Sequence, residues 1–221
     1  MNLTKSYDFF QPEKVDGRVH IIGCGSVGST VAENLARCGV KKMTLWDFDK
    51  VESHNICNQM FTEQHVGKLK VEALSDILKD INPEIDLVLK PKGWNGEMMS
   101  GYLFLAVDSI EIRRQIVELH KDNLSVFAVF DFRTLLESAQ HYAADWSNYK
   151  MKENLLNSMQ FTHDESMEEA PVSACGVTLG VATTVRLISA LGVNNFINFI
   201  KGNGIWKFVQ IDGFHGILDC F

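Results

Sequence analysis

The stretch "VHIIGCGSVGSTVAENLARCGV", residues 19–40, decides the fold class of this chain. It opens with a short apolar run, 19–22, which predicts a buried strand. Three glycines follow in the spacing G-x-G-x-x-G, at Gly23, Gly25 and Gly28, and apolar residues then recur on one helical face. Gly39 stands where a glycine caps the end of a helix. A glycine turn between a strand and a helix is typical of nucleotide-binding units.

Glycines let the backbone turn tightly and approach a phosphate, while the helix start offers free N–H donors and a partial positive charge. The motif alone leaves NAD, FAD, S-adenosylmethionine and ATP open, and a tight turn that binds nothing is the structural alternative. Asp47 lies about 20 residues further on, at the end of the next predicted strand, where an acidic residue meets a ribose hydroxyl. The alternative for Asp47 is a solvated strand end. Together, the two features favour ribose and phosphate binding.

The rest of the chain alternates strand and helix patterns. Apolar runs at 41–47, 85–91, 102–108 and 126–132 predict strands, and amphipathic runs at 68–83 and 109–123 predict helices. This alternation indicates an α/β, Rossmann-like fold with a mostly parallel sheet and helices on both of its faces. An apolar run at 176–200 predicts a long buried helix, and 205–213 with 215–221 predict a closing hairpin, an antiparallel C-terminal extension. One domain is expected over 1–221.

Residues 134–170 have a different character, because they are polar and end in an acidic run. The segment "SAQHYAADW", 138–146, is compatible with one more strand, and the middle of the region is interpreted as a long loop. Loops of this length in compact domains are usually functional or disordered. We treat 134–170 as a crossover loop region, followed by the late helix and closing strands of 171–221.

The composition excludes several classes of function. The net charge of −7 argues against a nucleic-acid partner, because phosphate backbones require a basic face. The chain has no apolar run of the length that a membrane span requires. Its five cysteines form no CxxC pair, which argues against a structural zinc site. An odd number of scattered cysteines fits a reducing compartment, and a cytoplasmic location is expected.

The segment "DFDKVESHNICNQMF", residues 47–61, is unusually polar for a stretch with so many apolar side chains. Asn55, Gln59 and the later Lys70 follow the ribose-type Asp47, and a dehydrogenase does not need them. An enzyme acting at the α-phosphate of ATP must hold a triphosphate, place a metal and neutralise developing charge. Lysine suits that task as a point charge, and amides contact phosphates without adding charge. The segment therefore favours ATP chemistry.

The order of these motifs resembles that of the ThiF/MoeB family, the adenylation domains related to ubiquitin-activating enzymes. The resemblance covers about residues 15–201 and is far more specific than any single motif. Its elements are G-x-G-x-x-G-S at 23–29, D-x-D-x-V at 47–51, N-x-x-x-Q at 55–59, G-K-x-K at 67–70, "INPEID" at 81–86, "AVDSIEIRRQI" at 106–116 and "ACGVTLGVATTVRLISAL" at 174–191.

The resemblance implies that ATP adenylates the C-terminal carboxylate of a small ubiquitin-like or sulfur-carrier protein ending in Gly-Gly, or of a peptide, with release of pyrophosphate. Asp47 would bind the ribose, and Lys70 would stabilise charge on the phosphates. Asp108 would position Mg²⁺, a hard cation that prefers oxygen ligands. The nucleotide-binding set implied is Gly23, Gly25, Gly28, Asp47, Asp49, Asn55, Asn58, Gln59 and Lys70. Taken singly, Lys70 also fits a solvated helix residue and Asp108 a helix N-cap.

Two departures from the family pattern concern arginine. The family has N-x-x-R-Q, but Asn58 stands in the arginine position here. The family's N-terminal R-Y-x-R-Q segment, which supplies an arginine to the partner subunit, is absent from this sequence. Lys14, Arg18 and Arg133 are the candidate substitutes, with no sequence ground to choose among them. Arg133 fits either a residue of the nucleotide cleft or an ion-paired surface residue.

Sulfur chemistry is the other open point, because residues 134–170 contain no cysteine. Cys175 directly follows that region and precedes a predicted helix, whose dipole would lower the pKa of a thiol. It is the candidate nucleophile, with a small buried apolar residue as the structural alternative. Cys24, within the glycine turn, is interpreted as a packing residue.

Three functions remain as hypotheses at this stage. The first is the adenylyltransferase, which is expected to be a homodimer through the late helix and residues 94–104. The second is a non-catalytic relative that binds nucleotide and serves as a dimeric binding platform, since the family's arginines are missing. The third is a Rossmann oxidoreductase that uses NAD, for which Asn55 and Lys70 have no purpose.

Overall fold

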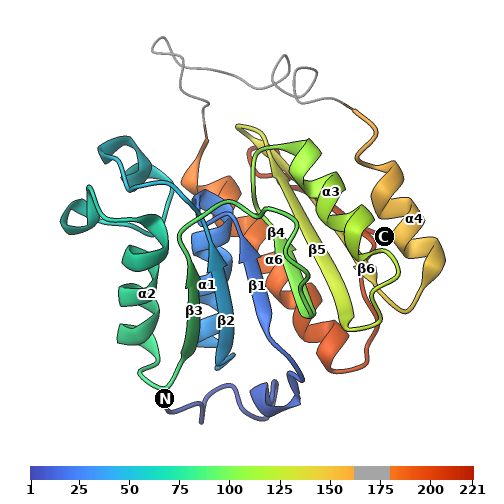
Figure 1. Cartoon of the computed structure of the whole chain (residues 1–221), viewed down its shortest axis with the longest axis horizontal. Helices are drawn as coiled ribbons and strands as arrows, with labels where there is room; N and C mark the ends of the chain where they lie inside the picture. The colour runs from blue at the N-terminus through green and yellow to red at the C-terminus, as the bar shows by residue number, and fades with distance from the viewer. Residues whose placement is uncertain (162–179) are drawn as a thin grey trace.

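A computed structural model describes residues 1–161 and 180–221 (Figure 1). One sheet of eight strands in the order β3-β2-β1-β4-β5-β6-β7-β8 organises the molecule. The strands are β1 Val19–Ile22, β2 Lys42–Trp46, β3 Asp86–Lys90, β4 Gly101–Leu105, β5 Val126–Thr134, β6 Ser138–Asp145, β7 Phe208–Asp212 and β8 Ile217–Cys220.

The first five strands are parallel and the last three form an antiparallel extension. β1 pairs in parallel with both β2 and β4, β2 with β3, and β4 with β5. β6 then turns back against β5, and β7 and β8 continue as the predicted hairpin. This arrangement confirms the predicted fold class. The carboxyl ends of the five parallel strands all lie at one edge of the sheet, where ligands bind in folds of this type.

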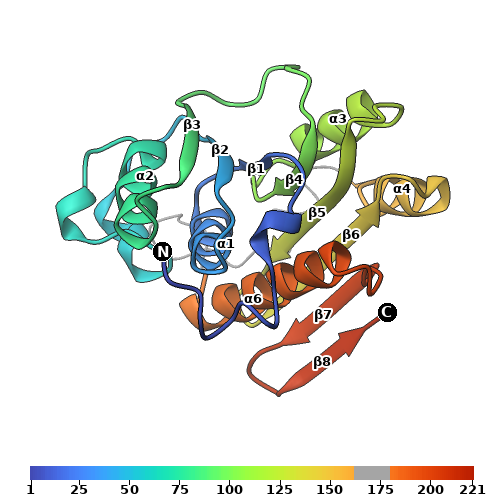
Figure 2. The same cartoon turned by 90° about the horizontal axis from the view of Figure 1, so that it is seen from below.

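Helices cover both faces of the sheet (Figures 1 and 2). One face carries α1, α2 and α6, and the other carries α3 and α4, in two separate apolar clusters. The helices are α1 Ser26–Arg37, α2 Lys70–Ile81, α3 Ile110–His120, α4 Tyr149–Asn157 and α6 Ala182–Ile200, with short 3₁₀ turns at Pro12–Lys14, Ser53–Cys57 and Glu63–His65. In the part of the chain that the structure describes, no helix has the length and apolar character needed to cross a membrane.

Helix α1 ends where its sequence predicts. Gly39 adopts φ +90°, a conformation that favours glycine. Its N–H donates to Ala36, and the N–H of Val40 donates to Leu35, the two bonds of a Schellman cap. The cap satisfies carbonyls at the helix end and turns the chain into β2, which places Asp47 beside the glycine turn.

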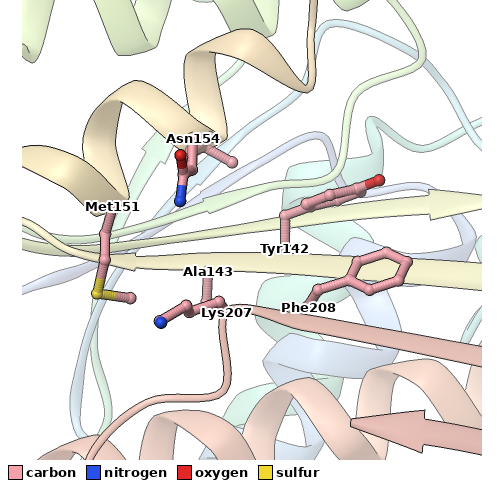
Figure 3. Close-up of a pocket in the computed structure, with 7 residues that line it drawn as sticks. Tyr142, Ala143, Met151, Asn154, Lys207 and Phe208 are labelled. Atoms are coloured by element: carbon pink, nitrogen blue, oxygen red, sulfur yellow. The ribbon is translucent and has the colours of Figure 1, made fainter. Parts of the chain in front are cut away.

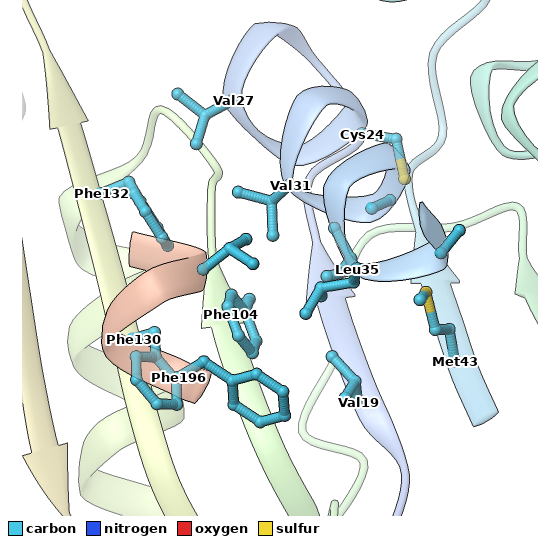
Figure 4. Packing of buried hydrophobic residues seen from close by; sticks show 14 of the residues in the cluster. Val19, Cys24, Val27, Val31, Leu35, Met43, Phe104, Phe130, Phe132 and Phe196 are labelled. Carbon is cyan, nitrogen blue, oxygen red and sulfur yellow. The ribbon is translucent and has the colours of Figure 1, made fainter. Parts of the chain in front are cut away.

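Aromatic side chains fill the core between the sheet and helix α6 (Figure 4). Phe104 of β4 stacks on Phe130 of β5, with ring centroids 4.7 Å apart. Phe196 of α6 meets both rings edge-on, at 5.6 and 5.7 Å. Edge-to-face and offset stacks of this kind stabilise a pair beyond its burial. The core therefore fixes α6 against the two strands that lead to the candidate site.

Two expectations for the second half of the chain need correction. Within 134–170, β5 continues to Thr134, β6 occupies 138–145 and 149–157 form helix α4, so the middle of this region is not a loop. The side chain of Asn148 caps α4, and Met151 and Leu155 are buried on one face. Only two buried positions in a polar helix make a weak periodic signal. The late helix α6 begins at Ala182, and residues 176–179 of its predicted range lie outside the described residues.

Candidate functional site

The predicted site residues lie where neighbouring strands lead into helices on opposite faces of the sheet. β1 leads into α1 on one face, whereas its neighbour β4 leads into α3 on the other. Such a switch point leaves a crevice between the two strand ends. Gly23 after β1 lies directly against Ala106 after β4, because a Cβ at Gly23 would come within 2.6 Å of the Ala106 carbonyl oxygen. Only glycine allows the two loops to approach this closely.

The other two glycines of the motif have opposite surroundings. A Cβ at Gly28 would lie 1.8 Å from the carbonyl oxygen of Gly23, so glycine here permits α1 to pack on the turn. A Cβ at Gly25 would meet no atom within 4 Å. Gly25 is also the N-cap of α1 and provides no side-chain cap for its first turn. The space at Gly25 and the uncapped helix start fit a bound phosphate.

Asp47 joins the end of β2 to the glycine turn. Its Oδ2 accepts the N–H of Cys24 at 2.7 Å, and its Oδ1 accepts the N–H of Asp49 at 2.8 Å. Burial raises the pKa of the Asp47 carboxyl, and the two N–H groups and the Lys70 ammonium partly offset this. Each carboxylate oxygen keeps a further lone pair for a ribose hydroxyl. Asp47 is therefore a buried bridging residue rather than a solvated strand end.

Lys70 is buried and ion-paired, which rejects the alternative of a solvated helix residue. Its Nζ lies 2.8 Å from Oδ2 of Asp49, and it is 8% exposed. The backbone brings the two residues together, since the N–H of Lys70 also donates to the Asp49 carbonyl at 2.8 Å. Lys70 is the first residue of α2, where the helix dipole disfavours a cation. A nearby anionic ligand would compensate this placement.

Asn55 and Ser29 shape the polar segment around the glycine turn. Oδ1 of Asn55 accepts the N–H of Glu52 at 2.9 Å and completes a capping box for the turn Ser53–Cys57. This bond fixes the side chain and turns its amide N–H₂ group away from Glu52. The hydroxyl of Ser29, the residue after the third glycine, accepts the N–H of Met60 at 3.2 Å. The segment 47–61 is thus bound to the glycine turn through Asp47 and to helix α1 through Met60.

Asn58 and Gln59 differ in their contacts. The amide of Asn58 donates to the carbonyl of Gly180 at 3.2 Å, close to the start of α6. The Oε1 atom of Gln59 is buried and has no hydrogen-bond partner among the described residues. An unsatisfied buried acceptor is costly, and bound ligand or water donors are the usual partners of such groups. Gln59 thus remains available to a ligand, while Asn58 is partly engaged by the protein.

Asp108 is exposed at the end of the loop after β4 and does not cap α3. The cap is Ser109, whose hydroxyl accepts the N–H of Ile112 at 3.2 Å. Asp108 accepts only the N–H of Ser109, at 2.9 Å, so one carboxylate oxygen remains for a cation. Among the described residues, no group of three or more His, Cys, Asp or Glu side chains is arranged to hold a metal. Mg²⁺ bound with a nucleotide takes only one or two carboxylates beside phosphate oxygens, and Asp108 fits that role.

The three candidate substitutes for the missing arginines lie at both edges of the sheet. Arg18 binds the Met43 carbonyl at 2.8 Å and the Asp86 carboxylate, at the amino ends of the strands. Lys14 lies in the 3₁₀ turn that precedes β1, on the same side. Arg133 was expected either in the nucleotide cleft or in an ion pair. It forms an ion pair, with its Nε 2.8 Å from Oδ2 of Asp131. Of the three, Arg133 alone lies at the carboxyl end of a parallel strand, and its substitution for a family arginine stays a prediction.

Asp131 is a buried charge that the sequence reasoning missed. It is 0% exposed and lies between the guanidinium groups of Arg113 and Arg133. Burial alone would raise the pKa of Asp131, but the two arginines overcome this effect and hold the pKa below its usual range. The signal was present in "VFAVFDFR", 126–133, where a carboxylate interrupts an apolar strand and an arginine follows two residues later.

The cysteines add no nucleophile to the described part of the site. Cys24 is buried in the glycine turn, as predicted, and burial raises the pKa of its thiol. Cys175, the candidate nucleophile, lies outside the described residues. Its role remains a prediction.

Two hollows of the surface lie away from the strand ends. One, of about 160 Å³, lies between α4 and strands β6 and β7 (Figure 3) and is lined by Tyr142, Ala143, Met151, Asn154, Leu155, Lys207 and Phe208. The other, of about 550 Å³, is lined by Trp94, Asn95, Gly96, Gln115, Glu118 and Leu119. Neither hollow includes a predicted nucleotide-binding residue.

Solved structures share this fold. The chain resembles E. coli MccB with MccA-N7isoASN, with a TM-score of 0.77 and 18% identity over 95% of this chain and 66% of that one. E. coli MccB with ATP gives a TM-score of 0.73 and 19% identity, over 95% of this chain and 65% of that one. At these identities the likeness concerns the fold alone.

Sequence comparison identifies the family. A curated relative, ubiquitin-like modifier-activating enzyme 5 of Drosophila mojavensis, is 41% identical over 225 aligned residues, which cover 92% of this chain. The chain spans about half of that relative, 54% of its length. The family model of the ThiF family matches residues 10–219, nearly the whole chain. The chain therefore belongs to the ThiF family.

Proposed function

We propose that this protein is an ATP-dependent adenylyltransferase that activates the C-terminal carboxylate of a small ubiquitin-like or sulfur-carrier protein, or of a peptide. The observation that carries the proposal is the ion pair between the buried ammonium of Lys70 and Asp49, 2.8 Å long, beside Asp47, the candidate ribose ligand, in a chain of the ThiF family. A buried cation at a helix start beside a glycine turn is arranged for a polyphosphate rather than for a dinucleotide alone. The family match also favours adenylation over the oxidoreductase hypothesis.

The described residues suggest a division of roles at the nucleotide. Asp47 would accept a ribose hydroxyl, and the backbone around Gly25 would approach phosphate oxygens. Asn55 and Gln59 would contact phosphates through amide groups, and Asp49 would hold the Lys70 ammonium in place. Lys70 would stabilise the charge that grows when a carboxylate oxygen attacks the α-phosphorus. The bond from that phosphorus to the pyrophosphate leaving group breaks, which yields an acyl adenylate and pyrophosphate.

Asp108 would hold Mg²⁺ together with phosphate oxygens. The ion, when bound, neutralises phosphate charge and orients the leaving group. The exposed carboxylate of Asp108 stands at the strand end adjacent to the glycine turn, which supports this assignment. Its remaining oxygen has no competing cap role, because Ser109 caps α3.

The partner is proposed from the names of the relatives. The Drosophila mojavensis relative is named for a ubiquitin-like modifier, and a solved E. coli relative contains MccA beside MccB. We therefore propose a protein or peptide with a free C-terminus, ending in Gly-Gly if it is ubiquitin-like. A homodimer through α6 and residues 94–104 is part of the proposal. A monomer in light scattering at micromolar concentration would refute that part.

A second candidate is a nucleotide-binding platform without catalysis. The observation in its favour is the absence of free arginine at the described strand ends: Asn58 replaces the family's arginine, and Arg133 is ion-paired. The two candidates differ in their products. An adenylyltransferase given ATP, Mg²⁺ and a suitable partner forms pyrophosphate and an acyl adenylate, which releases AMP when water or another nucleophile attacks its acyl carbon, whereas a platform binds ATP and leaves it intact. Chromatography of the nucleotide products separates them, and ADP with phosphate would contradict both.

A further inference from the structure

Arg113 connects the two strand ends nearest to Asp108. Its guanidinium is buried and donates to the carbonyls of Phe132 at 2.6 Å and of Leu105 at 3.5 Å. It also donates to the Val107 carbonyl and to the carboxylate of Asp131. One planar group thus holds the end of β4, the loop after it and the end of β5. Lysine, with a single ammonium, does not reproduce such a fork.

These contacts reach the backbone directly before Asp108, the residue that is proposed to bind the metal. Val107 precedes Asp108 in the chain, so the Arg113 bond to its carbonyl fixes the backbone from which Asp108 projects. The Asp108 side chain is exposed and receives one hydrogen bond, from its neighbour Ser109. Its orientation therefore depends on the backbone rather than on packing.

The carboxylate that holds Arg113 is a buried charge with two arginine partners. Asp131 is fully buried, and its second oxygen accepts from Arg133 at 2.8 Å. Removing charges from water is costly, and well-packed apolar residues often stabilise a core as well as a buried ion pair does. What an ion pair provides beyond stability is a defined geometry. The ion pair at the end of β5 therefore gives a defined geometry to the loop that leads to Asp108.

We propose that Arg113 and Asp131 are positioning residues for the Mg²⁺-binding carboxylate of Asp108. Arg113 acts through the Leu105 and Val107 carbonyls, and Asp131 orients Arg113. The inference rests on the proposed function, because it assumes that Asp108 meets the metal held with ATP. Residues that orient metal ligands commonly change metal affinity about 10- to 100-fold when they are replaced.

The test is calorimetric titration of ATP into the full chain at a series of Mg²⁺ concentrations and in EDTA. The variants are Arg113→Lys, which keeps the charge, and Asp131→Asn, which keeps the shape. Arg114→Lys is the matched control, since Arg114 is the next residue and binds the carbonyls of Met159 at 3.1 Å and Phe161 at 2.8 Å instead. Asp108→Asn serves as the reference for a lost metal ligand, and thermal melting shows that each protein is folded.

We expect Arg113→Lys and Asp131→Asn to raise the half-saturating Mg²⁺ concentration about tenfold, with ATP affinity in EDTA within about twofold of wild type. Arg114→Lys should change neither quantity. An unchanged Mg²⁺ midpoint in both folded variants, or an equal loss of affinity in EDTA, would overturn the positioning role. If wild type binds no ATP, or if Asp108→Asn leaves the Mg²⁺ dependence unchanged, the proposed function itself fails at this site. The two failures are thus distinguishable.

Discussion

The ammonium of Lys70 lies 2.8 Å from the carboxylate of Asp49, although the two residues are 21 positions apart in the chain. Three backbone bonds between the strand-like segments 49–51 and 67–70 produce this contact. They place a buried cation at the start of α2, beside Asp47 and the glycine turn. The pair joins the motifs at 47–51 and 67–70 in one polar site at the carboxyl edge of the sheet.

Replacing Lys70 by methionine tests its proposed role against the phosphates. Lys70→Met should lower the rate of pyrophosphate release by about 100-fold or more, because one preorganised charge at the α-phosphate is lost. Stability should change by no more than about 1 kcal/mol, since the Asp49 carboxylate is half exposed. The matched control is Lys68→Met, which removes an exposed lysine paired with Asp76 at 3.2 Å. Equal activity of the two variants would refute the role of Lys70.

Two glycines of one motif should respond in opposite ways to alanine. Gly28→Ala places a methyl 1.8 Å from a carbonyl oxygen, so the free energy of unfolding should fall by about 3 kcal/mol or more. Gly25→Ala meets open space, and its stability should stay within about 1 kcal/mol of wild type. ATP affinity should nevertheless fall in Gly25→Ala, because the methyl enters the space assigned to phosphate. Urea unfolding and calorimetry separate the two effects, and full ATP affinity in Gly25→Ala would contradict the assignment.

Helix α3 offers a test of which residue is structural and which is free for a ligand. Ser109→Ala should lower the free energy of unfolding by about 1 kcal/mol, because it removes the N-cap bond to Ile112. Asp108→Asn should leave stability within about 0.5 kcal/mol, since an exposed residue outside the cap is replaced. Denaturant titration of both variants measures the difference. The reverse order would mean that Asp108 is the cap after all.

The fold was predictable because local and long-range signals agree. The run 19–40 contains strand, glycine turn, helix and cap in one continuous stretch, and Gly39 ends α1 as its position predicts. Alternating apolar runs then imply the parallel sheet. The order of strands beyond β5 and the helix α4 were not predictable in the same way. Helix α4 buries only Met151 and Leu155, so its periodicity is lost among polar residues.

The site was predictable in its residues but not in its contacts. Asp47, Asp49 and Lys70 were nominated from the sequence, and the structure brings them together. The ion pair between Arg113 and Asp131 was not predictable, because it joins a side chain of helix α3 to one of strand β5. Pairing of that kind is set by the fold and leaves no local pattern in the chain.

Stability should decrease as the pH falls from about 6.5 to about 4. Burial lowers the pKa of His20 and of His141 to about 4, against an ordinary value of 6.5. Both are neutral when folded, and in His141 one ring nitrogen contacts the Asp131 carbonyl and the other the Asn195 amide. In this window the unfolded chain binds more protons, so acid favours unfolding. Each histidine should lower the free energy of unfolding by about 2 kcal/mol when the pH falls from 7 to 5.

Urea unfolding at several pH values measures this dependence. The variant His141→Gln should lose about 2 kcal/mol less than wild type between pH 7 and pH 5, whatever its absolute stability, because one of the buried histidines with a lowered pKa no longer titrates. A wild-type stability that is constant over that range would mean that these histidines are accessible to protons in the folded state.

The central claim is that a free carboxylate attacks the α-phosphate of ATP. Its most direct test is the exchange of labelled pyrophosphate into ATP, with a panel of small ubiquitin-like and sulfur-carrier proteins ending in Gly-Gly. Each partner is supplied in two forms, with a free C-terminal carboxylate and with a C-terminal carboxamide. We predict exchange with at least one carboxylate form, none with its carboxamide, and loss of the signal in Lys70→Met. Binding of ATP without exchange for any carboxylate form would contradict adenylation and leave the nucleotide-binding platform as the function of this chain.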